Sequence, residues 1–269
     1  MSARCLYLDL DGTLLGRGGS LLHDGEGGVA LEGVRAIQAC LRADVEVVLM
    51  SGRRRVQVAE DARLLGQRAF IFECACAVIE DDQLWVTGEM RPGESSIYEQ
   101  IERSGAPALL LERYAGRLEH HDPWHRGREV SHLFRGLLDT AEADRLLEAH
   151  GHHLRMIDNG AVSHASPALA ALPYVRGYHL VPAAASKARA VAAHRRVRGY
   201  ARGDTFAVGD SREDLGCAEH VDTFWLVANA PAQDPEIESR LAAHANVRLC
   251  ESGFGRGVYE AVVSTLVGG

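Results

Sequence analysis

The sequence predicts an α/β protein with a mostly parallel sheet, interrupted by an inserted α+β domain. Apolar strand patterns and amphipathic helix patterns alternate over residues 1–80 and resume over 185–269. Between them, over 81–184, short strand patterns alternate with polar turns. Strand–helix–strand alternation favours right-handed crossovers and parallel strands. We therefore expect two core segments, 1–80 and 185–269, and an inserted domain over 81–184.

The first core segment is expected to contribute strands and helices in turn. Its strand patterns are short apolar runs, and its helix patterns repeat apolar residues every three or four positions. In order, we expect a first strand that runs out at Asp9 and Asp11, a glycine-rich connection over 16–28, a helix over 29–41, a strand over 45–50, a helix over 54–65 and a strand over 69–72.

The inserted domain and the second core segment follow from the same patterns. In the inserted domain we expect strands over 84–87, 108–111, 153–157 and 178–181, helices over 96–103 and 141–150, and an exit hinge over 182–185. In the second core segment we expect helices over 187–194, 237–244 and 258–267, and strands over 204–208 and 223–227.

Composition narrows the classes of function. The chain has 29 basic and 37 acidic residues, and its net charge of −8 argues against a nucleic-acid partner. No stretch is long and apolar enough to span a membrane, and the N-terminal apolar run lacks the layout of a signal peptide. The six cysteines include no Cys-x-x-Cys pair, so we expect buried free thiols in a reducing compartment. We therefore expect a cytoplasmic protein without a membrane partner, its oligomeric state left open.

The first strand ends in two carboxylates, Asp9 and Asp11, followed by Gly12 and Thr13. Residues two apart in a strand point to the same face, so the carboxylates are expected side by side. Burying both is costly unless a cation compensates, and oxygen ligands suit Mg²⁺. Gly12 permits an unusual turn, and Thr13 brings a hydroxyl and an N–H to the strand end. The alternative is an ordinary Asp-Gly turn between strands.

Three more polar signals lie at strand ends or helix starts. Ser51, Gly52 and Arg53 follow the second strand, and Lys187 opens a helix after a serine. The pattern Gly-Asp-x-x-x-Asp, which includes Asp210 and Asp214, follows the strand over 204–208. In parallel sheets ligands bind at the carboxyl ends of the strands, where these residues are expected to meet.

These four motifs, in this order, resemble those of the haloacid-dehalogenase-like (HAD) phosphatase superfamily. The resemblance covers about 1–80 and 185–269. It implies a Rossmann-like core, and the position of the insertion resembles the type-2 cap of Cof-type and of mannosyl-3-phosphoglycerate or sucrose phosphatases. The resemblance implies an enzyme, a phosphoric monoester hydrolase that uses Mg²⁺.

The resemblance also implies roles for individual residues. Asp9 would be the nucleophile that forms an aspartyl-phosphate, Asp11 the general acid and base, and Lys187 the cation that neutralises them. The implied metal ligands are Asp9, Asp11 through its backbone carbonyl, Asp210 and Asp214. The implied phosphate- or substrate-binding residues are Gly12, Thr13, Ser51, Gly52, Arg53 and Asn229.

Several of these roles have structural alternatives. The alternative for Ser51 is a helix N-cap, for Gly52 and Asn229 a turn, and for Arg53 a solvated side chain. Asp214 is either a second metal ligand or the residue that holds the metal-site water or Lys187.

The chain departs from the family pattern at several positions. After the third strand, relatives carry a run like Glu-Asn-Gly-Ala, whereas this chain has Cys74 and Ala75 at the asparagine and glycine positions. Cys74 and Cys76 are expected to pack in the core, with a reactive or soft-metal role as the alternative. Glu213 either adds charge near the metal or faces solvent. A helix end rich in arginine (Arg195, Arg196, Arg198) is expected to be solvated.

The inserted domain is expected to select the substrate. Histidines and arginines are dense over 120–128 and 152–155. They form either a substrate-recognition surface or an ordinary solvated face, because no spacing typical of zinc sites supports a metal.

Together these features predict a Mg²⁺-dependent phosphomonoester hydrolase for a small phosphorylated metabolite, with a sugar phosphate suggested by the resemblance alone. The alternatives are a phosphotransferase or phosphomutase of the same superfamily, and a non-catalytic protein that binds sugar phosphates.

Overall fold

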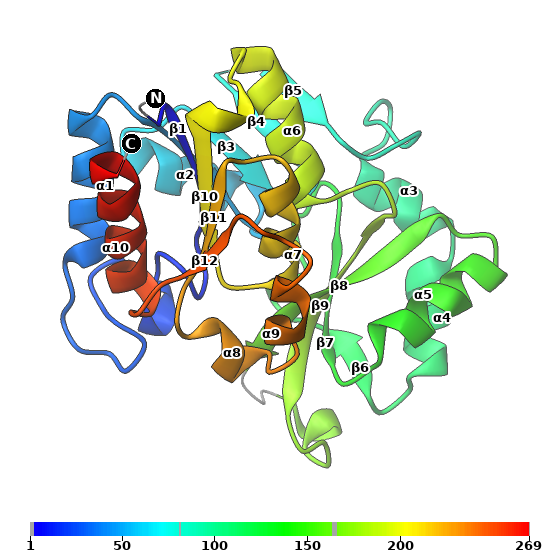
Figure 1. Cartoon of the computed structure of the whole chain (residues 1–269). Helices are drawn as coiled ribbons and strands as arrows, with labels where there is room; N and C mark the ends of the chain where they lie inside the picture. The colour runs from blue at the N-terminus through cyan, green and yellow to red at the C-terminus, as the bar shows by residue number, and fades with distance from the viewer. Residues whose placement is uncertain (1–2, 81, 163–165, 269) are drawn as a thin grey trace. The chain divides into compact units, whose positions relative to one another are not determined.

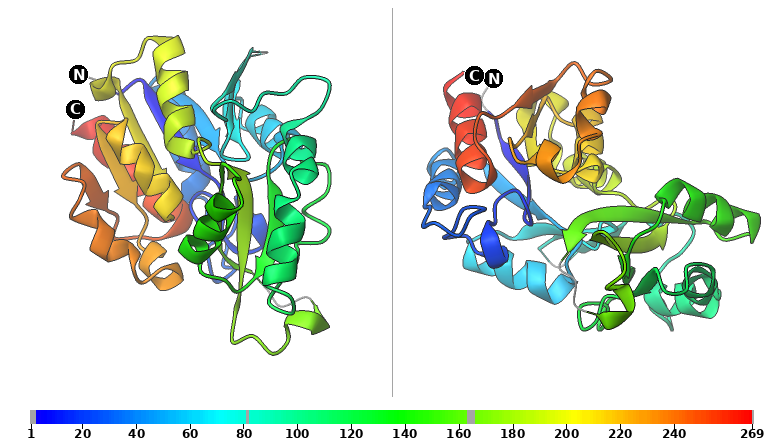
Figure 2. Two further views of the ribbon diagram at one scale, coloured as in Figure 1. Left: turned by 90° about the vertical axis from the view of Figure 1, so that its right-hand side faces the viewer. Right: turned by 90° about the horizontal axis from the view of Figure 1, so that it is seen from below.

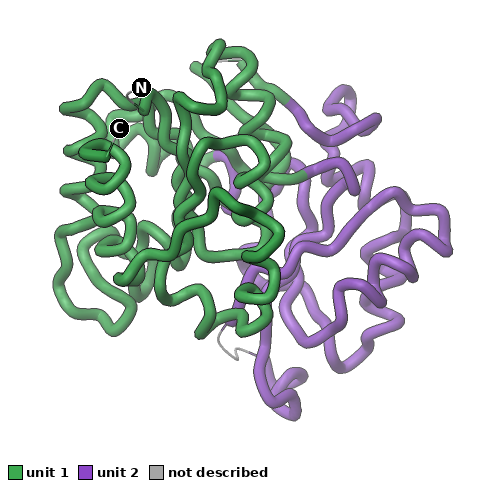
Figure 3. The backbone as a smooth tube through the Cα atoms, viewed as in Figure 1, with its two compact units in different colours: residues 1–51, 56–84, 186–269 green, residues 52–55, 85–185 purple. Residues whose placement is uncertain are grey.

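The computed structural model describes residues 3–80, 82–162 and 166–268. The chain divides into two compact units (Figure 3). The first contains residues 1–51, 56–84 and 186–269, and the second contains 52–55 and 85–185. Residues 52–55, which the sequence places in a core segment, therefore group with the second unit.

The first unit is built on a mixed sheet in the order β12-β11-β10-β1-β2-β3-β4-β5 (Figure 1). Its strands are β1 (Cys5–Asp9), β2 (Glu46–Met50), β3 (Ala69–Phe72), β4 (Cys76–Ile79), β5 (Asp82–Trp85), β10 (Thr205–Gly209), β11 (Thr223–Leu226) and β12 (Val247–Leu249). Its helices are α1 (Glu32–Arg42), α2 (Arg55–Leu64), α6 (Lys187–Arg198), α7 (Arg212–Leu215), α8 (Ala230–Gln233), α9 (Ile237–Leu241) and α10 (Phe254–Val267).

Strand β1 lies near the centre of this sheet and is buried along its whole length. It pairs in parallel with β2 on one side and with β10 on the other. Helices α1 and α10 lie side by side on one face of the sheet, and α6 and α7 lie on the other (Figures 1 and 2). Because helices cover both faces, β1 reads as a continuous apolar run until it reaches Asp9.

The second unit contains an antiparallel sheet in the order β6-β7-β9-β8. Its strands are β6 (Leu118–His120), β7 (His132–Gly136), β8 (Leu154–Val162) and β9 (Val175–Pro182), and its helices are α3 (Ile97–Arg103), α4 (Ala106–Arg113) and α5 (Thr140–Ala149). The Asp144 carboxylate on α5 accepts a 2.7 Å hydrogen bond from the Met156 N–H and so fastens this helix to β8.

The predicted fold class, an α/β core with a mostly parallel sheet and an α+β insertion, is confirmed. The strand predicted over 108–111 is wrong, because these residues lie in α4. Pro107 stands in the first turn of that helix, and the buried positions Ala106 and Leu110 are four apart. A run of four apolar residues is too short for periodicity to separate a strand from a helix. Strands β4, β6, β7 and β12 were not predicted.

No helix in the described part of the chain is both long and apolar enough to cross a membrane. None of the six cysteines, all of which lie in the described part of the chain, forms a disulfide, and all are buried, in agreement with the predicted packing of Cys74 and Cys76.

The buried His132 of β7 makes stability depend on pH. Its ring stacks on Tyr98 at 3.8 Å between centroids, and its Nε2 lies 3.0 Å from the Tyr98 carbonyl oxygen. Burial lowers the pKa of His132 to about 4, below its ordinary value of 6.5. As pH falls, the unfolded chain therefore binds the extra proton at a higher pH than the folded chain does. The contribution of neutral His132 to the free energy of unfolding is fully present above pH 6.5 and is lost between pH 6.5 and pH 4.

We predict that the wild-type free energy of unfolding falls between pH 7 and pH 5 by roughly 2 kcal/mol more than that of His132→Gln. Urea denaturation at both pH values measures the difference, with the exposed-residue variant His23→Gln as the control. Equal losses in the wild type and His132→Gln would show that His132 does not titrate in this way.

Candidate active site

Asp9 is the last residue of β1, and its side chain is buried beside α6. Its Oδ1 accepts a 2.6 Å hydrogen bond from Lys187 Nζ. Its Oδ2 is buried and has no hydrogen-bond partner among the described residues. One carboxylate oxygen is therefore held by a cation, while the other remains available to a ligand.

Lys187 is the first residue of α6 and is only 6% exposed. The preceding Ser186 caps the helix, because its hydroxyl accepts from the Arg189 N–H. Lys187 Nζ donates to Asp9 and also, over 2.7 Å, to Asp214 Oδ1. Burial disfavours the charge on Lys187, but the Asp214 and Asp9 carboxylates outweigh burial and raise the pKa of Lys187 well above its usual value. The lysine is therefore a fixed, buried cation between two carboxylates.

The loop after β10 brings two further carboxylates to this point. Asp210 follows β10 directly, and Asp214 lies within the short helix α7. Asp214 Oδ2 accepts from the Ser211 hydroxyl at 2.6 Å and from the Ser211 N–H at 3.1 Å. Because its Oδ1 is held by Lys187, both oxygens of Asp214 have protein partners. Gly209 is required here, since a Cβ at this position would lie 2.3 Å from Asp214 Cβ.

Asp9, Asp210 and Asp214 form a buried group whose nearest oxygens all lie within 4.8 Å of one another. Burial and then the neighbouring Asp214 carboxylate raise the pKa of Asp9 to about 7, despite Lys187. Burial and then Asp9 raise the pKa of Asp210 well above its usual range. These upward shifts come first from burial and then from repulsion among neighbouring carboxylates, which one lysine does not fully balance. The donor set and the unpartnered Asp9 Oδ2 fit a hard divalent cation such as Mg²⁺.

Gly12 lies against this group with a left-handed backbone, φ +87°. A Cβ at Gly12 would lie 2.1 Å from Asp210 Oδ2, so only glycine fits. The Gly12 carbonyl accepts a 2.8 Å hydrogen bond from Asn229 Nδ2, while Asn229 Oδ1 accepts from the Phe254 N–H at 2.9 Å. Asn229 therefore ties the loop after β1 to the start of α10. The neighbouring Thr13 is fully buried.

Other predicted residues are placed differently. Asp11 is exposed, and its carboxylate is not part of the group formed by Asp9, Asp210 and Asp214. Ser51 follows β2 in the first unit, is 2% exposed, and donates its N–H to the Ile71 carbonyl. Gly52 and Arg53 group with the second unit.

Within the second unit, Gly52 has close partners that the sequence did not indicate. Its carbonyl accepts a 3.0 Å hydrogen bond from Arg128 Nη1, which also donates to the Ser131 hydroxyl. His179 Nδ1 lies 3.1 Å from that hydroxyl, and its Nε2 would lie 2.7 Å from a Cβ at Gly52. A glycine is needed here for close packing, as well as for any turn.

Two local contacts fix the starts of α7 and α6. Ser211 and Asp214 form a reciprocal capping box around α7, as the Ser-x-x-Asp spacing indicates. Glu213 Oε1 accepts from the Lys187 N–H at 2.9 Å, so this carboxylate binds the start of α6. In the described part of the second unit, no histidine belongs to a group that could hold a metal.

Comparisons with known proteins bear on this geometry. No family model matches the chain. A phosphoglycolate phosphatase from Methanoculleus marisnigri is 24% identical over 270 residues, which cover 96% of this chain and 95% of that protein. The sucrose-phosphatase of Synechocystis sp. PCC6803, solved with sucrose and phosphate, matches with a TM-score of 0.69 at 15% identity, over 98% of both chains. BT1666 of Bacteroides thetaiotaomicron, a phosphatase of the HAD superfamily, matches with a TM-score of 0.65 at 14% identity, over 98% of this chain and 95% of that one. The chain has the HAD fold.

The predicted resemblance to HAD proteins is thus confirmed at the level of the fold. In this HAD fold the cluster of three carboxylates (Asp9, Asp210 and Asp214) lies at the carboxyl ends of β1 and β10, two adjacent parallel strands. Such strand ends are where open α/β sheets bind their ligands.

We predict that Asn229→Ala lowers the free energy of unfolding by about 1–3 kcal/mol, because the Gly12 carbonyl and the Phe254 N–H both lose their partner. Urea denaturation measures the change. Asn229→Asp keeps an acceptor for Phe254 but turns a carboxylate toward the Gly12 carbonyl, so it should be at least as destabilised. Wild-type stability in both variants would contradict a bridging role for Asn229.

Proposed function

We propose that this protein is a Mg²⁺-dependent phosphomonoester hydrolase that works through an aspartyl-phosphate on Asp9. One observation carries the proposal: a buried lysine ammonium holds one oxygen of Asp9, while the other oxygen has no partner among the described residues. The names of the relatives, a phosphoglycolate phosphatase and a sucrose-phosphatase, support phosphate-ester chemistry in this fold.

The proposed reaction has two steps. Asp9 attacks the phosphorus, the bond from phosphorus to the leaving oxygen breaks, and Asp11 gives that oxygen its proton. Asp11 then takes a proton from water, whose oxygen attacks the phosphorus and releases inorganic phosphate and the free Asp9 carboxylate. Throughout, the Lys187 ammonium compensates the negative charge shared by Asp9 and the phosphoryl group.

The residues that would hold Mg²⁺ are Asp9, Asp210 and the backbone carbonyl of Asp11. Both oxygens of Asp214 already have protein partners, which favours its role as the residue that holds Lys187. When bound, the metal would withdraw charge from the phosphoryl oxygens and from Asp9. Ser51, Thr13 and Gly12 are proposed to contact the phosphoryl group.

We propose a small phosphorylated metabolite as the substrate, with sugar phosphates the first class to test. The second unit, which includes Gly52, Arg53 and the antiparallel sheet, is proposed to select among substrates. The residues nearest to Gly52 within that unit, Arg128 and His179, are the first to vary when specificity is mapped.

We predict that Asp9→Asn releases phosphate from an aryl phosphate at least about 1000-fold more slowly than the wild type, because the nucleophile is lost. The matched control, Asp222→Asn, changes an exposed carboxylate and should retain wild-type activity. Full activity in Asp9→Asn would contradict the assignment. Product analysis with an added acceptor alcohol separates hydrolysis from phosphoryl transfer. A hydrolase transfers the phosphoryl group only to water, so no phosphorylated acceptor forms.

We also predict that chelation of divalent metal abolishes phosphate release and that Mg²⁺ restores it. Mg²⁺ should raise the melting temperature of the wild type, because it relieves the repulsion among the three carboxylates. The rise should be much smaller in Asp210→Asn. Undiminished phosphate release in excess chelator would contradict metal dependence.

A further inference from the structure

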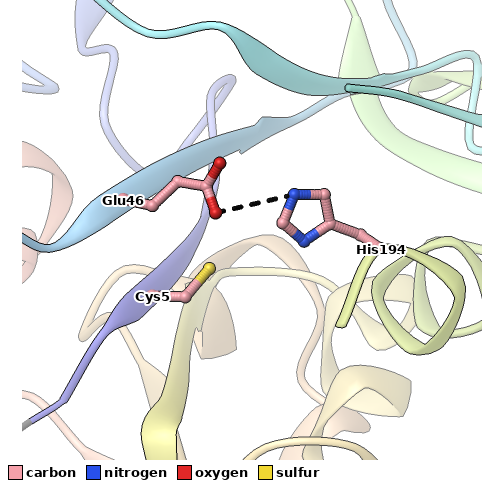
Figure 4. Close-up of side chains that lie close together, drawn as sticks. All are labelled: Cys5, Glu46 and His194. Atoms are coloured by element: carbon pink, nitrogen blue, oxygen red, sulfur yellow. Dashed lines mark ion pairs between the residues drawn. The ribbon is translucent and has the colours of Figure 1, made fainter. Parts of the chain in front are cut away.

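A second cluster of buried ionisable side chains lies at the opposite end of β1 from Asp9. Cys5 is the first residue of β1, Glu46 is the first residue of β2, and His194 lies on α6. The three side chains converge on one point (Figure 4), and their nearest ligand atoms all lie within 4.8 Å of one another. Among the described residues, this group and the carboxylates around Asp9 are the two that could hold a metal ion.

The convergence follows from the periodicities of a strand and a helix. Cys5, Tyr7 and Asp9 alternate along β1 and so share one face. Lys187 and His194 are seven residues apart on α6, about two turns, and so share one side of that helix. Since Lys187 reaches Asp9, His194 must lie toward the start of β1. The parallel register then places Glu46 directly beside Cys5.

His194 has one ring nitrogen in use and one unused. Its Nδ1 lies 2.9 Å from the Tyr7 hydroxyl. Its Nε2 lies 3.7 Å from Glu46 Oε2, too far for a hydrogen bond, and has no hydrogen-bond partner in the described parts of the chain. The ring is fully buried, and its unused Nε2 faces Glu46 Oε2 (Figure 4).

Glu46 is oriented by groups on and just after α6. Its Oε1 accepts from Arg198 at 2.8 Å and its Oε2 accepts from the Tyr200 hydroxyl at 3.0 Å. Arg198, which the sequence placed in solvent, thus fixes the carboxylate, so that Oε2 faces His194. In the same way, the Tyr7 hydroxyl orients the His194 imidazole through Nδ1. Partners of this kind typically hold metal ligands in place.

We propose that Cys5, Glu46 and His194 bind a thiophilic divalent cation, with Zn²⁺ as the first candidate. A thiolate, an imidazole and a carboxylate are all common zinc ligands. Two ligands on a tetrahedral zinc lie about 3.4 Å apart, close to the 3.7 Å between His194 Nε2 and Glu46 Oε2. On binding, the Cys5 S–H bond breaks, a sulfur–metal bond forms and the proton passes to solvent.

A hollow in the surface reaches one member of this cluster, Glu46. A hollow of about 380 Å³ opens beside the cluster, and its lining includes Glu46, Arg198 and Tyr200. Glu46 is the partly exposed member of the group, whereas Cys5 and His194 are fully buried. The ion would therefore meet the carboxylate first and the thiol last.

Cobalt absorption tests this site separately from the proposed activity. One equivalent of Co²⁺ is added to chelator-treated, reduced full-length protein, and the near-ultraviolet thiolate-to-cobalt charge-transfer band is recorded. We expect the band in the wild type and in Cys250→Ser, a control that removes another buried thiol. The band should be absent in Cys5→Ser. In the wild type, added Zn²⁺ should remove the band by displacing Co²⁺. Co²⁺ bound only by the oxygens around Asp9 gives no such band.

A second variant, at the partly exposed ligand Glu46, tests the site even if Cys5→Ser does not fold. Glu46→Gln should keep the band but weaken Co²⁺ binding at least about 10-fold, with wild-type circular dichroism. Absence of the band in the wild type, its survival in Cys5→Ser, or unchanged affinity in Glu46→Gln would overturn the proposal. Asp9→Asn should retain the band while losing phosphate release, so the two proposals fail or succeed independently.

Discussion

The contact on which the site depends is the pair of hydrogen bonds from Lys187 Nζ to Asp9 and Asp214. Three carboxylates are buried at the ends of β1 and β10, and such burial is unfavourable without a compensating cation. Lys187 supplies one positive charge from within the fold. For this, α6 must begin beside Asp9, which is why the Ser186 cap and the Glu213 contact with the Lys187 N–H matter. The remaining repulsion favours a divalent metal.

One strand face and one helix face account for both clusters of ionisable groups. The alternation of β1 brings Asp9 and Cys5 to the same face at opposite ends, and the two-turn spacing of α6 brings Lys187 and His194 to them. The end at Asp9 gathers hard oxygen ligands, and the end at Cys5 gathers a thiol, an imidazole and a carboxylate. The different chemistry of the ends suits different ions.

The sequence alone predicted the strands that end at or just before Asp9, Ser51 and Asp210, because polar residues at the end of apolar runs are a local signal. It did not predict that residues 108–111 are helical, since a short apolar run fits either structure. It left the role of Asp214 open, because which of its oxygens meet Lys187 and Ser211 depends on loop geometry. The cluster at Cys5 was missed because its members come from distant segments with no shared spacing.

The most direct measurement of the central claim is the identity of the residue that becomes phosphorylated. Enzyme turning over an aryl phosphate is quenched in acid and treated with borohydride, which reduces an acyl phosphate to the alcohol, and the peptides are sequenced by mass spectrometry. If Asp9 is the nucleophile, homoserine appears at position 9 and nowhere else, and it depends on Mg²⁺. Homoserine at position 11, or a phosphoryl group retained on another residue, would contradict the account.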